Sequence, residues 1–109
     1  MKHNCDPASQ TLTLTFPGDV ISTNSDATRQ EITALLESPL VKSFSWQTLQ
    51  LDLRAARMID SVGLNLIVSL LKIAKGRNAK VVSQISSTNV QRSFIFTRLN
   101  TQMDIDLAA

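Results

Sequence analysis

A strand pattern, a helix pattern and a second strand pattern follow one another over residues 48–85, and few folds accommodate this succession. Polar and apolar residues alternate over Thr48–Leu53, as in a β-strand with one buried face. Val62–Lys75 carries apolar residues at helical spacing, and Ala79–Ile85 again has the composition of a strand. Connections this short between strand, helix and strand favour a right-handed crossover and therefore parallel strands. The predicted fold class is α/β.

Shorter patterns on both sides of this unit extend the predicted sheet. Residues 1–9 are polar, contain a proline and show no periodicity, so we expect a flexible N-terminal tail before one domain over residues 10–109. Thr11–Phe16 alternates and predicts a strand that ends at Pro17-Gly18. The other expected elements are a short strand over residues 19–22, a helix from Asn24 or Ser25 to before Pro39, a helix from Ser86 through Leu99, and a last strand over residues 103–107.

Length and composition exclude several classes of protein. A chain of 109 residues has room for one core, which excludes a multidomain enzyme. Apolar residues make up 43% and charged residues 18%, unlike a disordered chain, and the net charge of +2 gives no reason to expect direct nucleic-acid binding. Cys5 and His3 are the single cysteine and histidine, which excludes a disulfide framework and a cysteine-based zinc cluster. We therefore expect neither a metal nor another cofactor.

The expected location is the cytoplasm. The longest apolar stretch, Leu64–Leu71, is well short of the roughly 20 residues that span a bilayer, so no membrane insertion is predicted. The first seven residues lack the apolar core of a secretory signal. A single cysteine is also typical of a reducing compartment.

The helix predicted over Val62–Lys75 is apolar on two sides, and Gly76 suits a left-handed residue at its C-terminal end. We expect the sheet to be covered by the stripe formed by Leu64, Ile67, Val68 and Leu71. A second stripe on the other side consists of Val62, Leu66, Leu70 and Ile73. An ordinary surface helix carries charges there, so either another part of the chain or a partner protein covers this second stripe.

The segment Asp60-Ser61-Val62-Gly63-Leu64 begins this helix and allows two interpretations. In the first, Ser61 or Asp60 is the N-cap, a role that contributes about 1 kcal/mol. In the second, Ser61 is phosphorylated, since a helix N-terminus accommodates a phosphate. A phosphate beside Asp60 and an apolar surface would weaken partner binding by repulsion and desolvation, which makes a switch. Gly63 has no side chain, so another protein's backbone could approach the serine closely.

These residues resemble the STAS domain, a family named from sulfate transporters and anti-sigma factor antagonists. The resemblance rests on Leu51-Asp52-Leu53, six further residues, and then Asp60–Leu64 with its apolar helix and Gly76. It extends more weakly to Gly18-Asp19-Val20, the first helix and the Val90–Leu99 helix. It covers about residues 10 to 107.

The resemblance implies a four- or five-stranded mixed sheet with helices mainly on one side, and a regulator that is not an enzyme. Stand-alone bacterial members bind an anti-sigma factor that is also a serine kinase of the histidine-kinase-like ATPase type. The kinase phosphorylates the motif serine, here Ser61, and breaks the complex, and a PP2C-type phosphatase restores binding. By this resemblance the chain is an anti-sigma factor antagonist that acts by partner switching.

The predicted partner-binding surface combines the motif with the second stripe. Where the family commonly has Gly-Glu-Leu-Asp in its first turn, this chain has Gly18-Asp19-Val20-Ile21, so the acidic contact is either lost or moved to Asp19. Many relatives continue into a final helix where this chain ends, so a bare face would favour a partner or a homodimer. The predicted contacts are Asp19, Asp60, Ser61, Val62, Gly63, Leu66, Leu70 and Ile73.

Other interpretations of single residues stay open at this point. The alternative function is that of a non-enzymatic STAS subunit of a lipid-transport ATPase complex, in which Ser61 needs no phosphate. Arg54 and Arg57 either contact an acidic partner or a phosphate on Ser61, or are solvated. Asp52 is expected to be a strand-end residue rather than half of a metal-binding pair with Asp60. The aromatic residues Phe44, Trp46, Phe94 and Phe96 are expected in the core or at its edge.

Overall fold

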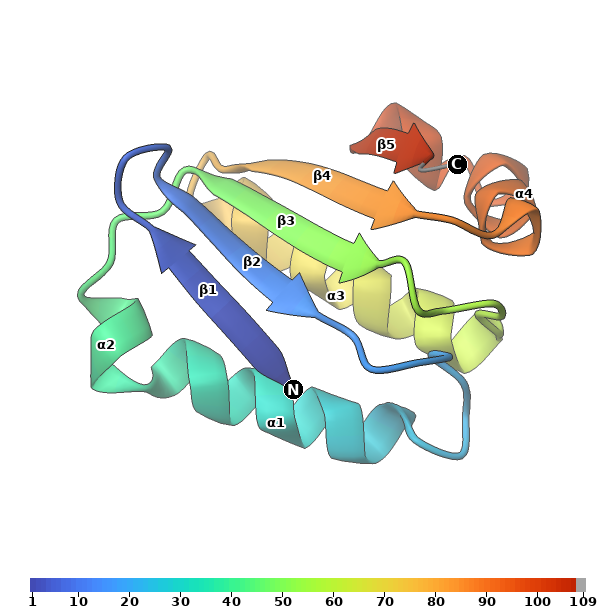
Figure 1. Cartoon of the computed structure of the whole chain (residues 1–109), viewed down its shortest axis with the longest axis horizontal. Helices are drawn as coiled ribbons and strands as arrows, with labels where there is room; N and C mark the ends of the chain where they lie inside the picture. The colour runs from blue at the N-terminus through green and yellow to red at the C-terminus, as the bar shows by residue number, and fades with distance from the viewer. Residues whose placement is uncertain (108–109) are drawn as a thin grey trace.

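The structure, a computed structural model, describes residues 1–107. It consists of one five-stranded sheet and the helices that pack on it. The strands are β1 (Lys2–Asp6), β2 (Thr11–Thr15), β3 (Thr48–Leu53), β4 (Lys80–Ile85) and β5 (Asp104–Leu107). The helices are α1 (Ser25–Glu37), α2 (Pro39–Lys42), α3 (Ser61–Gly76) and α4 (Thr88–Phe96), followed by a 3-10 turn over Leu99–Thr101 (Figure 1). The predicted C-terminal boundary at Ala109 lies outside the described residues.

The strands lie side by side in chain order, from β1 at one edge of the sheet to β5 at the other. Strands β2 to β5 are parallel, and β1 pairs antiparallel with β2. The predicted α/β fold with a mixed sheet is therefore confirmed. The parallel strands follow from the short helical crossovers, which return each strand in the direction of the one before.

Two predictions for the first twenty-two residues were wrong. Lys2–Asp6 is not a flexible tail but the edge strand β1, in register with β2 over its whole length. The turn that follows is held by Asp6, whose carboxylate accepts hydrogen bonds from the Ala8 amide and the Ser9 hydroxyl. Residues 19–22 are not a strand, since Val20 makes an isolated bridge to Ile59. Both outcomes depend on pairing with distant segments, which a local pattern does not report.

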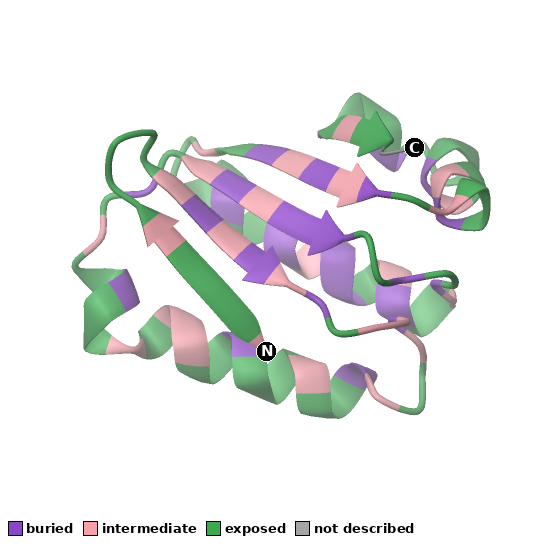
Figure 2. Ribbon diagram, in the orientation of Figure 1, coloured by how far each residue is buried: buried purple, intermediate pink, exposed green. Residues whose placement is uncertain are grey.

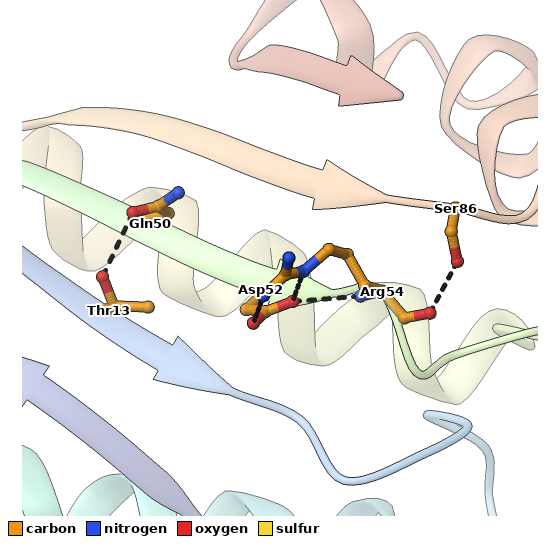
Figure 3. A network of polar contacts seen from close by, with 5 residues as sticks. All are labelled: Thr13, Gln50, Asp52, Arg54 and Ser86. Atoms are coloured by element: carbon orange, nitrogen blue, oxygen red, sulfur yellow. Dashed lines mark hydrogen bonds and ion pairs between the residues drawn. The ribbon is translucent and has the colours of Figure 1, made fainter. Parts of the chain in front are cut away.

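The core lies between one face of the sheet and the helices (Figure 2). Alternate residues of β2 and β3 are buried, as the alternating pattern predicted: the buried apolar ones are Leu12, Leu14, Leu49, Leu51 and Leu53, and Asp52 is buried as well. The residues between them form the other face, where Thr13 donates a hydrogen bond to the Gln50 side chain at 3.2 Å (Figure 3). That face is half-buried and polar, so the helices cover mainly one side of the sheet.

Helix α3 turns a different face to the sheet from the one predicted. Its buried residues are Gly63, Leu66, Ile67, Leu70, Leu71 and Ala74. Two of these residues come from each predicted stripe: Ile67 and Leu71 from the first, and Leu66 and Leu70 from the second. The small residues Gly63 and Ala74 lie between the two stripes on the helix surface. This inner strip of α3 faces the interior of the protein, so Leu64 and Val68, which flank it, are only half-buried.

The end of α3 also differs from the prediction. Gly76 is still helical, Arg77 is the C-cap, and no glycine of the described residues has a positive φ. The left-handed residue is Asn78, with φ 57°. Asparagine tolerates this conformation because its short polar side chain interacts with the local backbone. Arg77 instead places its guanidinium 3.8 Å from the centre of the Trp46 ring.

Candidate partner-binding site

Two loops at the carboxyl ends of β2 and β3 are held together by side chain to backbone hydrogen bonds. The Asp19 carboxylate accepts from the backbone amides of Arg57 and Met58, at 2.8 and 3.2 Å. The Val20 amide donates to the Met58 carbonyl, and the Asp60 amide donates to the Val20 carbonyl. Asp19 therefore fixes the loop that precedes Ser61.

Asp60 is the N-cap of α3, and its two carboxylate oxygens serve different segments. Oδ1 accepts from the Gly63 amide at 2.9 Å, and Oδ2 accepts from the Ser22 amide at 2.7 Å. These backbone hydrogen bonds stabilise the charged carboxylate and lower the pKa of Asp60 below its ordinary value. Asp60 thus joins the start of α3 to the loop after β2.

Gly63 is buried against the backbone of Val20. A Cβ atom at this position would lie 1.9 Å from the Val20 carbonyl oxygen and 2.7 Å from its carbon. The prediction that Gly63 gives a partner access to the serine was wrong, because the backbone that approaches it belongs to the same chain. The glycine of the motif is required for packing between the two loops.

Ser61 is the first residue of α3 and is exposed. The interpretation of Ser61 as the N-cap was wrong, since Asp60 has that role. Within residues 1–107, the Ser61 hydroxyl makes no hydrogen bond. A kinase could therefore reach this oxygen without displacing an intramolecular partner. The positive end of the α3 helix dipole lies next to this hydroxyl.

A polar pair lies at the end of β3, with Asp52 in the strand and Arg54 directly after it (Figure 3). The Arg54 guanidinium donates from two nitrogens to the two carboxylate oxygens of Asp52, each at 2.9 Å, and this pairing lowers the pKa of Asp52. The Arg54 carbonyl accepts from the Ser86 hydroxyl at 2.6 Å. Asp52 is thus a strand-end residue, as predicted, and the described residues contain no group of three potential metal ligands.

The loop after β4 also contacts this arrangement. The Ser87 hydroxyl donates to the Arg57 carbonyl at 3.2 Å and accepts from the first-turn amides of α4. The loops after β2, β3 and β4 are therefore connected by hydrogen bonds at the carboxyl ends of these strands. Ser61 lies on a rigid support rather than on a free loop.

Apolar side chains remain exposed next to Ser61, in the last turn of α3 and on α4. Val62 and Ile73 are accessible, with 40% and 45% of their surfaces exposed, and Met58 is 57% exposed. Two other predicted contacts, Leu66 and Leu70, were wrong, because both side chains are buried in the core. A shallow hollow lies between α3 and α4 and is lined by Leu64, Arg92, Ser93, Ile95, Phe96 and Thr97.

The most exposed aromatic residue, Phe96, was missed as a surface feature. Phe94 is fully buried, whereas Phe96 is 89% exposed and Ile95 is 52% exposed. The helical period could have shown this, because residues two apart in a helix point about 200° apart. Phe94 and Phe96 cannot both face the core. The prediction that both are core or edge residues was therefore wrong for Phe96.

Comparison with known proteins agrees with the fold and the motif. The STAS domain family matches residues 4–106, so the chain belongs to the STAS domain family. A similar solved structure is the crystal structure of an anti-sigma factor antagonist from Mycobacterium paratuberculosis, with a TM-score of 0.75 and 16% identity. The match covers 98% of this chain and 86% of that chain and shows a common fold. No curated protein matches this chain. No helix of residues 1–107 is long and apolar enough to cross a membrane.

Proposed function

We propose that this protein is a cytoplasmic regulator that binds an anti-sigma factor when Ser61 is unmodified and releases it when Ser61 is phosphorylated. The observation that carries the proposal is the exposed Ser61 hydroxyl at the first position of α3, with the capping role taken by Asp60. STAS family membership and the fold shared with an anti-sigma factor antagonist support the same role. The protein itself acts by binding and not by catalysis.

The chemistry at Ser61 favours a switch in affinity rather than in folding. Transfer of the γ-phosphoryl group of ATP to the Ser61 oxygen releases ADP and adds a charge of about −1.5 to −2. The positive end of the α3 helix dipole stabilises that charge, so the phosphorylated helix stays intact. The Asp60 carboxylate is turned towards the Gly63 and Ser22 amides and leaves room at the serine.

The surface that loses affinity is the apolar one beside the serine. Val62 follows Ser61 directly, and Leu64 lies one turn further along α3 at the edge of the hollow with Ile95 and Phe96. A partner that buries these side chains would also desolvate a phosphate on Ser61, at a cost in binding free energy. We expect the partner to be a serine kinase of the histidine-kinase-like ATPase type, opposed by a PP2C-type phosphatase.

The test compares three variants for binding to purified serine-kinase anti-sigma factors of the source organism. Ser61→Asp should lower affinity at least tenfold, whereas Ser61→Ala should bind like the unmodified protein and resist phosphorylation by ATP. Ser61→Asn, which has nearly the shape of Asp without its charge, separates charge from size. Equal affinity of the Asp and Asn variants would contradict the switch. Absence of phosphate on Ser61 in growing, starved and stressed cells would favour a transporter-subunit role instead.

A further inference from the structure

Strand β1 is an edge strand whose outer side has no partner strand in the sheet. Lys2, His3, Asn4 and Asp6 are exposed and Cys5 is half-buried, so solvent reaches side chains along the whole strand (Figure 2). An edge strand presents unpaired backbone N–H and C=O groups that can pair with another strand. The described part of β1 contains no proline or bulge that would prevent such pairing.

The sequence of β1 is complementary to itself in one antiparallel register. In this register, Asn4 of one copy lies opposite Asn4 of the other. Lys2 of each copy then lies opposite Asp6 of the other, and His3 lies opposite Cys5. Each such contact occurs twice because the pairing is two-fold symmetric. Opposite charges directly across antiparallel strands stabilise the pair. Registers shifted by two residues lose both charge pairs.

The other edge of the sheet has the opposite property. Strand β5 carries Asp104 and Asp106 on one side, with Ile105 between them. If two β5 strands pair antiparallel about residue 104, 105 or 106, carboxylates lie directly opposite one another, which is destabilising. Lys80, 3.6 Å from the Asp104 carboxylate, offsets part of this repulsion. Self-association through the sheet is therefore favoured at β1 and opposed at β5.

A hollow beside β1 gives the second strand an apolar contact. It is lined by His3, Asn4, Cys5, Pro7, Leu40, Ser43 and Phe44. Leu40 of α2 is 68% exposed, and the Phe44 side chain is packed partly against the core. A strand paired with β1 would cover this hollow from its open side and bury apolar surface that now faces water.

We infer that two copies of this chain associate through their β1 strands, centred on Asn4, to form one continuous sheet of ten strands. The inference does not depend on the proposed function. In the sheet, β1 lies at the edge opposite to β5, away from α4 (Figure 1). The hollow that contains Phe96 is lined mostly by residues of α4. The dimer would therefore leave both Ser61 surfaces free and present two of them at once.

Disulfide trapping tests the register directly. In the full-length protein, His3→Cys places a thiol opposite Cys5 of the second copy, within the range of about 4.4–6.8 Å between Cα atoms that a disulfide requires. We expect a covalent dimer in a glutathione redox buffer, with the bond mapped between positions 3 and 5 by peptide mass spectrometry.

Two controls each carry one thiol in β1. They are the unmodified protein, with Cys5 alone, and His3→Cys combined with Cys5→Ser. Neither places two thiols opposite one another in this register, so both should stay largely unlinked. Equal crosslinking of all three proteins, or no dimer of the His3→Cys protein, would overturn the inference.

Charge reversal tests the interface without a new thiol. Lys2→Glu places two carboxylates opposite one another at both ends of the paired strands and should weaken the dimer about tenfold, as measured by sedimentation equilibrium. Lys72→Glu makes the same change in charge on the exposed side of α3 and should leave the dimer unchanged. The inference would be contradicted if the unmodified protein were monomeric at every concentration, or if both variants had equal effects. In that case, any strand that pairs with β1 would come from a different protein.

Discussion

The support beneath Ser61 and the outer surface of α4 use their side chains in opposite ways. Beneath Ser61, the carboxylates of Asp19 and Asp60 are occupied by backbone amides of neighbouring segments. On α4, Ile95 and Phe96 extend into solvent with little packing. The acidic residues that first suggest contact with a partner therefore maintain the structure, whereas the apolar residues that first suggest a core are available for binding. Stability and recognition can be altered separately.

The largest effect on stability is expected at Gly63. Gly63→Ala places a methyl group 1.9 Å from the Val20 carbonyl oxygen, and backbone atoms must move to relieve the clash. We expect a loss of about 3 kcal/mol in the free energy of unfolding, measured by urea denaturation.

Gly76→Ala is the matched control in the same helix. No atom lies within 4 Å of the added methyl group, and the backbone there is not left-handed. This variant should be more stable by about 0.5–1 kcal/mol, because alanine favours the helix over glycine. Similar losses for both variants would show that Gly63 does not bear on the packing of the two loops.

A smaller loss is expected on removal of the N-cap. Asp60→Ala leaves the Gly63 and Ser22 amides without their acceptor and should destabilise the protein by about 1–2 kcal/mol in urea denaturation. Ser61→Ala, one residue later, should stay within about 0.5 kcal/mol of the unmodified protein because its hydroxyl supports nothing. A reversed order of these two variants would return the capping role to Ser61.

The acid sensitivity of the fold follows from the same carboxylates. The pKa values of Asp52 and Asp60 are lower in the folded chain than the ordinary value of 3.8. Their stabilising effect is therefore complete above pH 3.8 and is lost as the pH falls through the folded-state values. Arg54→Gln should raise the pKa of Asp52 and leave that of Asp60 unchanged in a carboxyl NMR titration. A parallel rise of both values would indicate a loosened loop rather than a lost ion pair.

Phe96 is where we expect the smallest effect on stability. The same substitution should have a large effect on partner binding. Phe96→Ser should change the free energy of unfolding by less than about 0.5 kcal/mol, because the side chain is 89% exposed. Binding to the serine-kinase partner should fall at least tenfold, measured by calorimetry. Arg98→Ser, an exposed change just after the helix, is the control. Unchanged binding of the Phe96 variant would move the interface away from α4.

Local patterns in the sequence predicted most of the regular elements correctly. Thr48–Leu53 has the same bounds in the structure, and the helix predicted over Val62–Lys75 is α3 with one more residue at each end. The period of two in a strand and of 3.6 in a helix depends on adjacent residues alone, so it survives any tertiary context. The motif at Asp60–Leu64 likewise pointed to the family that the comparison shows.

The features that the sequence left open are those that depend on a distant segment. The bond from the Ser22 amide to Asp60 and the closed surroundings of Gly63, which depend on Val20, both join segments about 40 residues apart. The buried face of α3 is decided by the segments that pack against it. The edge strand β1 exists because β2 pairs with it. Periodicity assigns side chains to a common face, but only the tertiary structure decides what that face meets, because long-range contacts bring together residues that no local pattern relates.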